Sequence, residues 1–206
     1  MIFSESPLAG AYMVEMELLA DERGFFARSY CALEFAQHGL PELRQCSVSY
    51  NARAGTLRGM HYQAAPREEH KLVRCTAGAV FDVIVDVRPS SPTYRRWFAA
   101  ELSAANRRSL FIPPGFAHGF MSLSEHAEVY YMISVAHSPE LSRGFRWNDP
   151  AVAIEWPLAP TVIQALSASL HCTAERYPCG GLVAAAQCSP PLAVQAAVFA
   201  ELPGFA

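Results

Sequence analysis

The stretch Ala79–Val87, AVFDVIVDV, carries the clearest fold signal in this sequence. Valine, isoleucine and phenylalanine fill most of its positions, which is typical of a β-strand. Side chains alternate between the two faces of a strand, so the odd-numbered positions from 81 to 87 form a wholly apolar face. The other face places Asp82 and Asp86 beside aliphatic residues. The pattern therefore predicts a buried strand that carries two carboxylates on its mixed face.

Seven further runs rich in β-branched and aromatic residues flank this stretch. They are separated by turn residues, and the prolines within 88–93 and 112–115 cannot continue a strand. The runs are Gly10–Glu17, Cys46–Tyr50, Lys71–Ala77, Trp97–Leu102, Ser109–Ile112, Gly119–Leu123 and Ala127–Ser134. A spacing of about 8–12 residues is typical of β-sandwiches and β-barrels, so the sequence predicts an all-β fold.

Helical periodicity is scarce in this chain. Ala32–His38 is predicted to form one short helix, which Gly39 closes. The composition changes near residue 157, and residues 193–206 could form a weakly amphipathic helix or a docked tail. We therefore expect a β-domain over residues 1–158 and a divergent C-terminal extension over 159–206, packed on or beside it.

Composition excludes several classes of protein. The chain has 206 residues, is 51% apolar and 17% charged, and carries a net charge of -3, which argues against disorder and against nucleic-acid binding. No apolar run approaches the ~18 residues of a membrane span, and the N-terminus lacks the features of a signal peptide. The six cysteines form no C-x-x-C pair. We expect reduced thiols in a cytoplasmic protein that binds no membrane.

Two histidines lie in unusual surroundings, His61 after Gly59 and His118 between small and aromatic residues. Neither belongs to the H-x-H pattern of metal-binding barrels, so no metal site is predicted. The sequence also lacks a G-x-S-x-G elbow, a P-loop and a dinucleotide-binding glycine motif. Acid–base chemistry by His, Tyr, Lys and Asp, without a cofactor, is the remaining prediction.

Seven motifs, taken in order, resemble the dTDP-4-dehydrorhamnose 3,5-epimerase family. The resemblance runs from about residue 10 to about residue 158. It implies a cupin-like jelly-roll β-barrel, also called a double-stranded β-helix, with a few short helices; it also implies a homodimer. The motifs are Asp21–Phe26, Gly55–Gln63, Lys71–Arg74, Val80–Arg88, Ser91–Thr93, Ile112–Phe120 and Arg146–Pro150.

The resemblance also implies a reaction. Members epimerise nucleotide-linked 4-keto-6-deoxyhexoses, in which the C4 ketone acidifies the protons on C3 and C5. His61 matches the general base, and Lys71 matches the lysine that stabilises the enolate. Tyr131 matches the acid on the opposite face, and its neighbour Tyr130 would point to the other side of the strand. Asp82 matches a pocket carboxylate.

The expected substrate-binding residues complete this assignment. Arg23 and Arg58 match positions near the diphosphate, where a guanidinium can donate two hydrogen bonds. His118 matches the pocket wall. Phe26, Arg28 and Gln45 fall in the segments that contact the nucleotide side, where Arg28 replaces a glutamate present in many members.

The sequence departs from the family where an aspartate normally orients the base. In the corresponding segment, Leu166–Leu170, leucine occupies the aspartate position. Either another group orients His61, or the protein is a non-catalytic nucleotide-sugar-binding homologue. The sequence leaves open the nucleotide (dTDP, CDP or GDP) and the epimerised carbon (C3, C5 or both).

Overall fold

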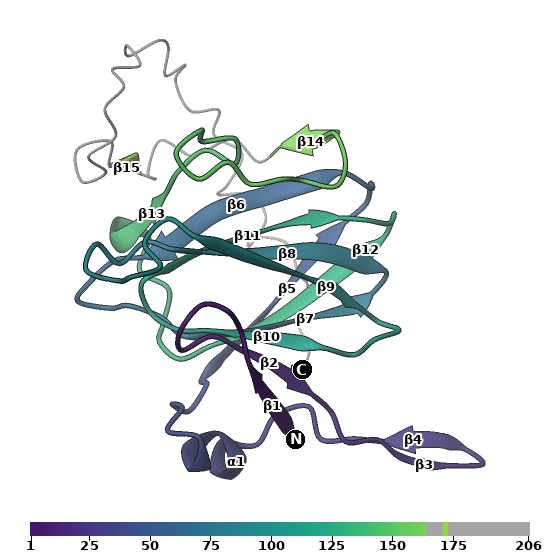
Figure 1. Cartoon of the computed structure of the whole chain (residues 1–206). Coiled ribbons are helices and arrows are strands. Elements are labelled where there is room, and N and C mark those ends of the chain that lie inside the picture. The colour runs from purple at the N-terminus through teal and green to yellow at the C-terminus, as the bar shows by residue number, and fades with distance from the viewer. Residues whose placement is uncertain (164–170, 173–206) are drawn as a thin grey trace, which may run out of the picture.

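The computed structural model describes residues 1–163 and 171–172, and these residues form an almost entirely β-structure (Figure 1). A six-stranded sheet has the order β1-β2-β10-β7-β12-β5, and a second sheet has the order β15-β13-β6-β11-β8-β9, with β14 pairing with β6. The elements are β1 Ile2–Glu5, β2 Tyr12–Glu15, β3 Leu19–Asp21, β4 Gly24–Phe26, α1 Ala32–Gln37, β5 Gln45–Asn51, β6 Thr56–Gln63, β7 Lys71–Ala77, β8 Ala79–Asp86, β9 Trp97–Ser103, β10 Ser109–Ile112, β11 Phe116–Ser122, β12 Ala127–Ile133, a 3-10 turn Pro139–Leu141, β13 Ser142–Gly144, β14 Val162–Ile163 and β15 His171–Cys172.

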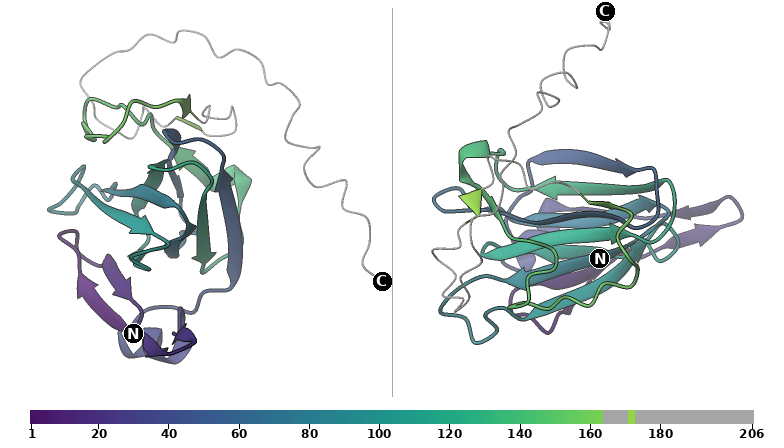
Figure 2. Two further views of the ribbon diagram at one scale, coloured as in Figure 1. Left: turned by 90° about the vertical axis from the view of Figure 1, so that its right-hand side faces the viewer. Right: turned by 90° about the horizontal axis from the view of Figure 1, so that it is seen from above.

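The chain crosses repeatedly between the two sheets. Strands β5, β7, β10 and β12 belong to the first sheet, whereas β6, β8, β9, β11 and β13 belong to the second. The two sheets face each other around one interior, as the end-on view in Figure 2 shows. This arrangement confirms the all-β prediction and is that of a jelly-roll barrel.

The predicted strands correspond to observed ones, and β6 is the longest strand that the sequence pattern did not predict. All eight predicted runs overlap strands, and the predicted helix is α1, which is followed by Gly39 at a φ of 69°. Strand β6 was not among them. Its β-branched pattern is broken by Gly59, so only tertiary pairing with β11 and β13 makes it a strand.

Strand β8 is buried on both faces, which explains its nearly continuous apolar sequence. Val80 and Ile84 pack in the barrel interior. Val83 and Val85 pack on the outside against Phe145 and the segment that follows it. That segment runs from β13 toward β14 and covers the outer face of the second sheet (Figures 1 and 2).

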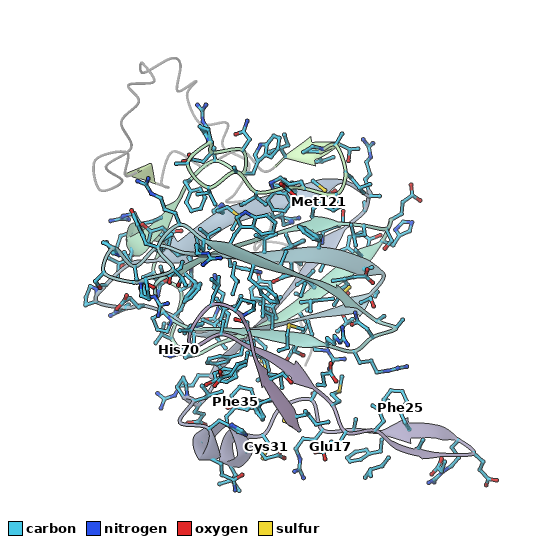
Figure 3. The ribbon with its side chains drawn as sticks, viewed as in Figure 1. Glu17, Phe25, Cys31, Phe35, His70 and Met121 are labelled. Carbon is cyan, nitrogen blue, oxygen red and sulfur yellow. The ribbon has the colours of Figure 1, made fainter. Side chains whose placement is uncertain are left out.

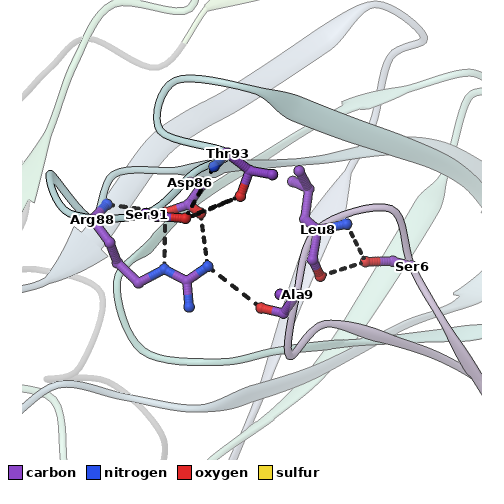
Figure 4. Close-up of polar contacts among 7 residues, drawn as sticks. All are labelled: Ser6, Leu8, Ala9, Asp86, Arg88, Ser91 and Thr93. Atoms are coloured by element: carbon purple, nitrogen blue, oxygen red, sulfur yellow. Dashed lines mark hydrogen bonds and ion pairs between the residues drawn. The ribbon is translucent and has the colours of Figure 1, made fainter.

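The two carboxylates of β8 have different surroundings. Asp86 is buried and accepts hydrogen bonds from Arg88, Ser91 and Thr93, while Arg88 also donates to the carbonyl of Ala9 (Figure 4). Burial alone would raise the Asp86 pKa, but these hydrogen bonds outweigh it and lower the pKa to about 2. Asp86 therefore anchors the turn after β8. Asp82 lies deeper in the barrel and belongs to the site described below.

The N-terminal region closes one face of the six-stranded sheet. Phe35 of α1 packs edge-on against Phe111 of β10, and Figure 3 shows it between the helix and the sheet. The β3–β4 hairpin instead projects away from the barrel (Figure 1), and 70% of Phe26 is exposed. Among the described residues, no helix is long and apolar enough to cross a membrane.

Strands β6 and β11 approach unusually closely beside the cavity. A Cβ on Gly59 would lie 2.5 Å from the Cα of Gly119, and one on Gly119 would lie 2.6 Å from the Met60 sulfur. Gly59 also has a φ of 124°, which L-residues with side chains rarely adopt. The register shifts at this point and leaves His61 directly opposite His118. The two glycines thus allow the pairing that sets these histidines side by side.

We predict that Gly59→Ala destabilises the protein by about 2–5 kcal/mol, because the new methyl group adds overpacking to an unfavourable φ. Gly24→Ala is the matched control, since Gly24 has a φ of 129° but no atom within 4 Å of the position that a new methyl group would occupy. This control should lose only about 1–2 kcal/mol. Urea denaturation measures both values, and equal losses would show that crowding at Gly119 is unimportant.

Candidate active site

A cavity of about 210 Å³ lies between the two sheets. Side chains from five strands line it, so it exists only when the barrel is closed. The lining residues are Ser49, Arg58, His61, Lys71, His118, Gly119, Phe120 and Tyr131. The fold therefore brings together five residues that the sequence singled out from β6, β7, β11 and β12.

His61 presents a free ring nitrogen in this cavity. Its Nε2 atom is buried and has no hydrogen-bond partner in the described part of the chain. Burial, the positive charge of Lys71, His118 and the positive charge of Arg58 together lower its pKa to about 4. The ring is therefore neutral at neutral pH, which is the state that a general base requires.

Lys71 opens strand β7 and reaches the same cavity. Its ammonium forms an ion pair with Glu69, in which Nζ lies 2.8 Å from Oε1, and the two side chains are only 13% and 10% exposed. The sequence motifs did not single out Glu69. The available signal was its position two residues from Lys71, which by itself does not distinguish a buried carboxylate from a solvated one.

Tyr131 and Tyr130 point to opposite sides of β12, as the strand alternation predicts. Tyr131 lines the cavity, and burial raises its pKa, so the phenol keeps its proton. Tyr130 lies on the other side, where its hydroxyl is hydrogen-bonded to Cys46. Tyr131 is thus the phenol placed to exchange a proton inside the cavity.

Asp82 is completely buried and lies behind the cavity wall rather than in it. His118 Nε2 donates to Asp82 Oδ2 at 2.9 Å, and the His118 ring itself lines the cavity. This differs from the expectation of a carboxylate that faces the pocket directly. The position of Asp82 on β8, next to β11, lets it orient His118 instead.

Arg58 supplies a second positive charge to the cavity wall. Its Nε donates to Asn51 Oδ1 at 2.8 Å, and Nη2 donates to the Tyr50 carbonyl at 3.4 Å. Both acceptors are neutral, so these contacts fix the guanidinium while leaving its charge uncompensated by them. Such a group is suited to an anionic ligand.

Four expected substrate-binding residues lie apart from the cavity of their own chain. Arg23 is 85% exposed on the β3–β4 hairpin and pairs with Asp21, and Phe26 lies on the same hairpin. Arg28 pairs with Glu34 at 2.7 Å. Gln45 lines a separate, open hollow of about 600 Å³ that also includes Arg44 and Arg67.

Two further expectations concern Leu170 and the absence of a metal site. Leu170 lies outside the described residues, so the question of what replaces the missing aspartate stays with the described neighbours of His61. Among the residues with described positions, no three His, Cys, Asp or Glu side chains are grouped so that they could hold a metal ion.

Comparison with known proteins gives one consistent family. The family model described as dTDP-4-dehydrorhamnose 3,5-epimerase matches residues 5–171, which extends past the predicted limit near residue 158. The Sinorhizobium fredii protein named dTDP-4-dehydrorhamnose 3,5-epimerase is 41% identical over 164 residues, covering 79% of this chain and 84% of that protein.

Solved structures agree with this result. The Bacillus anthracis dTDP-4-dehydrorhamnose 3,5-epimerase, solved with TDP and PPi bound, is 40% identical with a TM-score of 0.77, over 79% of this chain and 94% of that one. The Legionella pneumophila enzyme, in complex with dTDP-4-keto-L-rhamnose, is 37% identical with a TM-score of 0.74, over 79% and 87%. With its jelly-roll barrel and a cavity built from the family's own motifs, this chain belongs to the dTDP-4-dehydrorhamnose 3,5-epimerase family.

Proposed function

We propose that this protein epimerises a dTDP-linked 4-keto-6-deoxyhexose at C3, C5 or both, as a step in deoxysugar biosynthesis. The observation that carries the proposal is the placement of base and acid on opposite walls. His61 comes from β6 of one sheet, whereas Tyr131 comes from β12 of the facing sheet. Epimerisation needs this arrangement, because a proton leaves one face of the sugar and another arrives on the opposite face.

The first half of the reaction is removal of a carbon-bound proton. His61 Nε2 takes the proton from the carbon beside the C4 ketone, and the electron pair of that C–H bond moves to give an enolate with its negative charge on the C4 oxygen. The Lys71 ammonium lies in the same cavity and stabilises this oxygen. The neutral state of His61 makes it competent to accept the proton.

The second half returns a proton from the other side. The Tyr131 hydroxyl donates its proton to the carbon as the enolate collapses to the ketone, which inverts the centre. The raised pKa of Tyr131 keeps the donor protonated between turnovers. His118, held by Asp82, forms part of the wall against the sugar, and Arg58 provides a cation for the diphosphate.

We also propose that the active form is a homodimer. Arg23 and Phe26 are exposed on a hairpin that projects from the barrel, although both match substrate-binding positions. A two-fold partner would bury this apolar hairpin and could receive its side chains at the mouth of the partner's cavity. The proposal that the nucleotide is dTDP rests on the TDP and the dTDP-linked sugar that the similar structures contain.

Solvent exchange provides the direct test of the base. With dTDP-4-keto-6-deoxyglucose in D2O, the wild type should incorporate deuterium at C3 or C5, and His61→Asn should reduce exchange on the order of 10²–10⁴-fold. Because His61 must be neutral, kcat/KM should fall only as the pH drops through its lowered pKa of about 4, rather than near the ordinary 6.5. Binding of the nucleotide sugar without any exchange would favour the non-catalytic alternative.

Tyr131→Phe should separate proton removal from inversion. His61 would still remove the proton and return deuterium to the same face, so exchange should continue while net epimerisation falls by about 10²-fold or more. Tyr130→Phe is the control, because Tyr130 lies on the other side of β12 and should leave both rates unchanged. NMR follows the two processes in one sample. Parallel losses of exchange and inversion in Tyr131→Phe would contradict its role as the acid.

Mixing two inactive variants tests the dimer. Light scattering should give a particle of twice 22.6 kDa. If the hairpin serves the partner's cavity, Arg23→Ala and His61→Asn should each be weak alone, yet a refolded equimolar mixture should regain roughly a quarter of the wild-type activity through heterodimers with one complete site. A mixture no more active than its components would place Arg23 outside the partner's cavity.

A further inference from the structure

Glu69 is the ion-pair partner of the cavity residue Lys71, and it has no role in the reaction proposed above. It precedes Lys71 by two residues and forms an ion pair with the Lys71 ammonium, with Oε1 2.8 Å from Nζ. Its side chain is only 10% exposed, whereas the adjacent Glu68 is exposed to solvent. A carboxylate is removed from water at a cost unless a partner compensates for the loss, and Lys71 is the partner that compensates this largely shielded carboxylate.

The charges around His61 show what this carboxylate can do. Arg58 on β6, Lys71 on β7 and His118 on β11 all disfavour a positive charge on His61, whereas Glu69 favours it. Asp82 on β8 is already bonded to His118, Tyr131 on β12 is neutral, and Arg143 on β13 donates to the carbonyls of Glu140 and Ser142. The negative charge of Glu69 thus acts on His61 in the direction opposite to that of the three basic side chains on β6, β7 and β11.

We propose that Glu69 is a positioning residue of this active site, which holds the Lys71 ammonium against the cavity and balances the charge of His61 after the ring takes up a proton. The inference rests on the epimerase function proposed above. In this role Glu69 supplies the negative charge that stabilises protonated His61, which is one of the two effects of an orienting aspartate.

The positioning role follows from the structure of lysine. Its ammonium sits on a flexible four-carbon stem and carries three donors, so an unpaired side chain would populate several rotamers. The contact with Glu69 selects one of them and leaves the remaining donors of the ammonium for an anionic oxygen. The charge-balancing role follows from the proton transfer, because it creates an imidazolium beside two fixed cations, Arg58 and Lys71.

Three substitutions separate these roles. Glu69→Gln keeps an acceptor for Lys71 but removes the charge. Glu69→Asp keeps the charge but withdraws the acceptor by one methylene group, and Glu69→Ala removes both. Glu68→Gln is the matched control, because it removes an adjacent exposed carboxylate.

The pH dependence provides a readout that a purely structural role would not move. Without the negative charge, Glu69→Gln should lower the pKa of His61 further and also lower that of Tyr131, since Glu69 raises both. Both limbs of the kcat/KM profile should therefore move to lower pH, by about one unit. Glu69→Asp should leave the limbs in place but reduce kcat about 10-fold with little change in KM, through a displaced Lys71. Glu69→Ala should show both effects, and Glu68→Gln neither.

A second measurement keeps this test independent of turnover. NMR titration of the His61 imidazole without substrate should show the same downward shift in Glu69→Gln and none in Glu68→Gln. Unmoved profiles and an unmoved titration would overturn the inference while leaving the epimerase function intact. A wild type that exchanges no protons would instead refute the proposed function, and the titration would still decide whether Glu69 sets the charge of His61.

Discussion

The close approach of β6 and β11 at Gly59 and Gly119 is the constraint on which the site depends. Neither position has room for a Cβ atom, since each would overlap the backbone or a side chain of the other strand. Their approach coincides with a shift in register that places His61 opposite His118. On the other side of β6, His61 pairs with Gly144 of β13. The proposed base therefore lies on a strand that is held between two neighbouring strands, not on a loop. A fixed base is what proton transfer from carbon requires.

The six-stranded sheet carries the cavity residues that lie opposite His61. Lys71 on β7 and Tyr131 on β12 lie on adjacent strands, and Val73 of β7 pairs with Tyr131. The barrel interior thus presents the neutral imidazole of His61 from one wall and a cation and a phenol from the other. In the proposed reaction a proton leaves one face of the sugar and another arrives on the opposite face, and the two facing sheets supply side chains on both sides of the cavity.

Three carboxylates of the barrel each lie beside a basic side chain, whereas His61 does not pair with a carboxylate in the described residues. Asp86 is tied to Arg88 and the turn after β8, Asp82 to His118, and Glu69 to Lys71. His61 has no such partner in the described residues, and burial among cations keeps it neutral. Each of these carboxylates thus has a basic side chain as its neighbour, while His61 Nε2 is left open toward the cavity.

The sequence alone determined the all-β class and eight of the strands, and the family resemblance pointed to five of the residues that line the cavity. Strand alternation is a local property, so the chain itself indicated that Asp82 lies on the mixed face of its strand and that Tyr130 and Tyr131 point to opposite sides, while the family resemblance selected Tyr131. Strand β6 could not, because Gly59 hides its pattern and only its pairing with β11 reveals it. Tertiary structure also decided that Asp82 lies behind His118, that Glu69 pairs with Lys71, and that Arg23 and Phe26 lie on a projecting hairpin. These facts depend on which segments that are distant in the sequence come into contact. The sequence pattern indicates which positions are buried, but not which residues they contact.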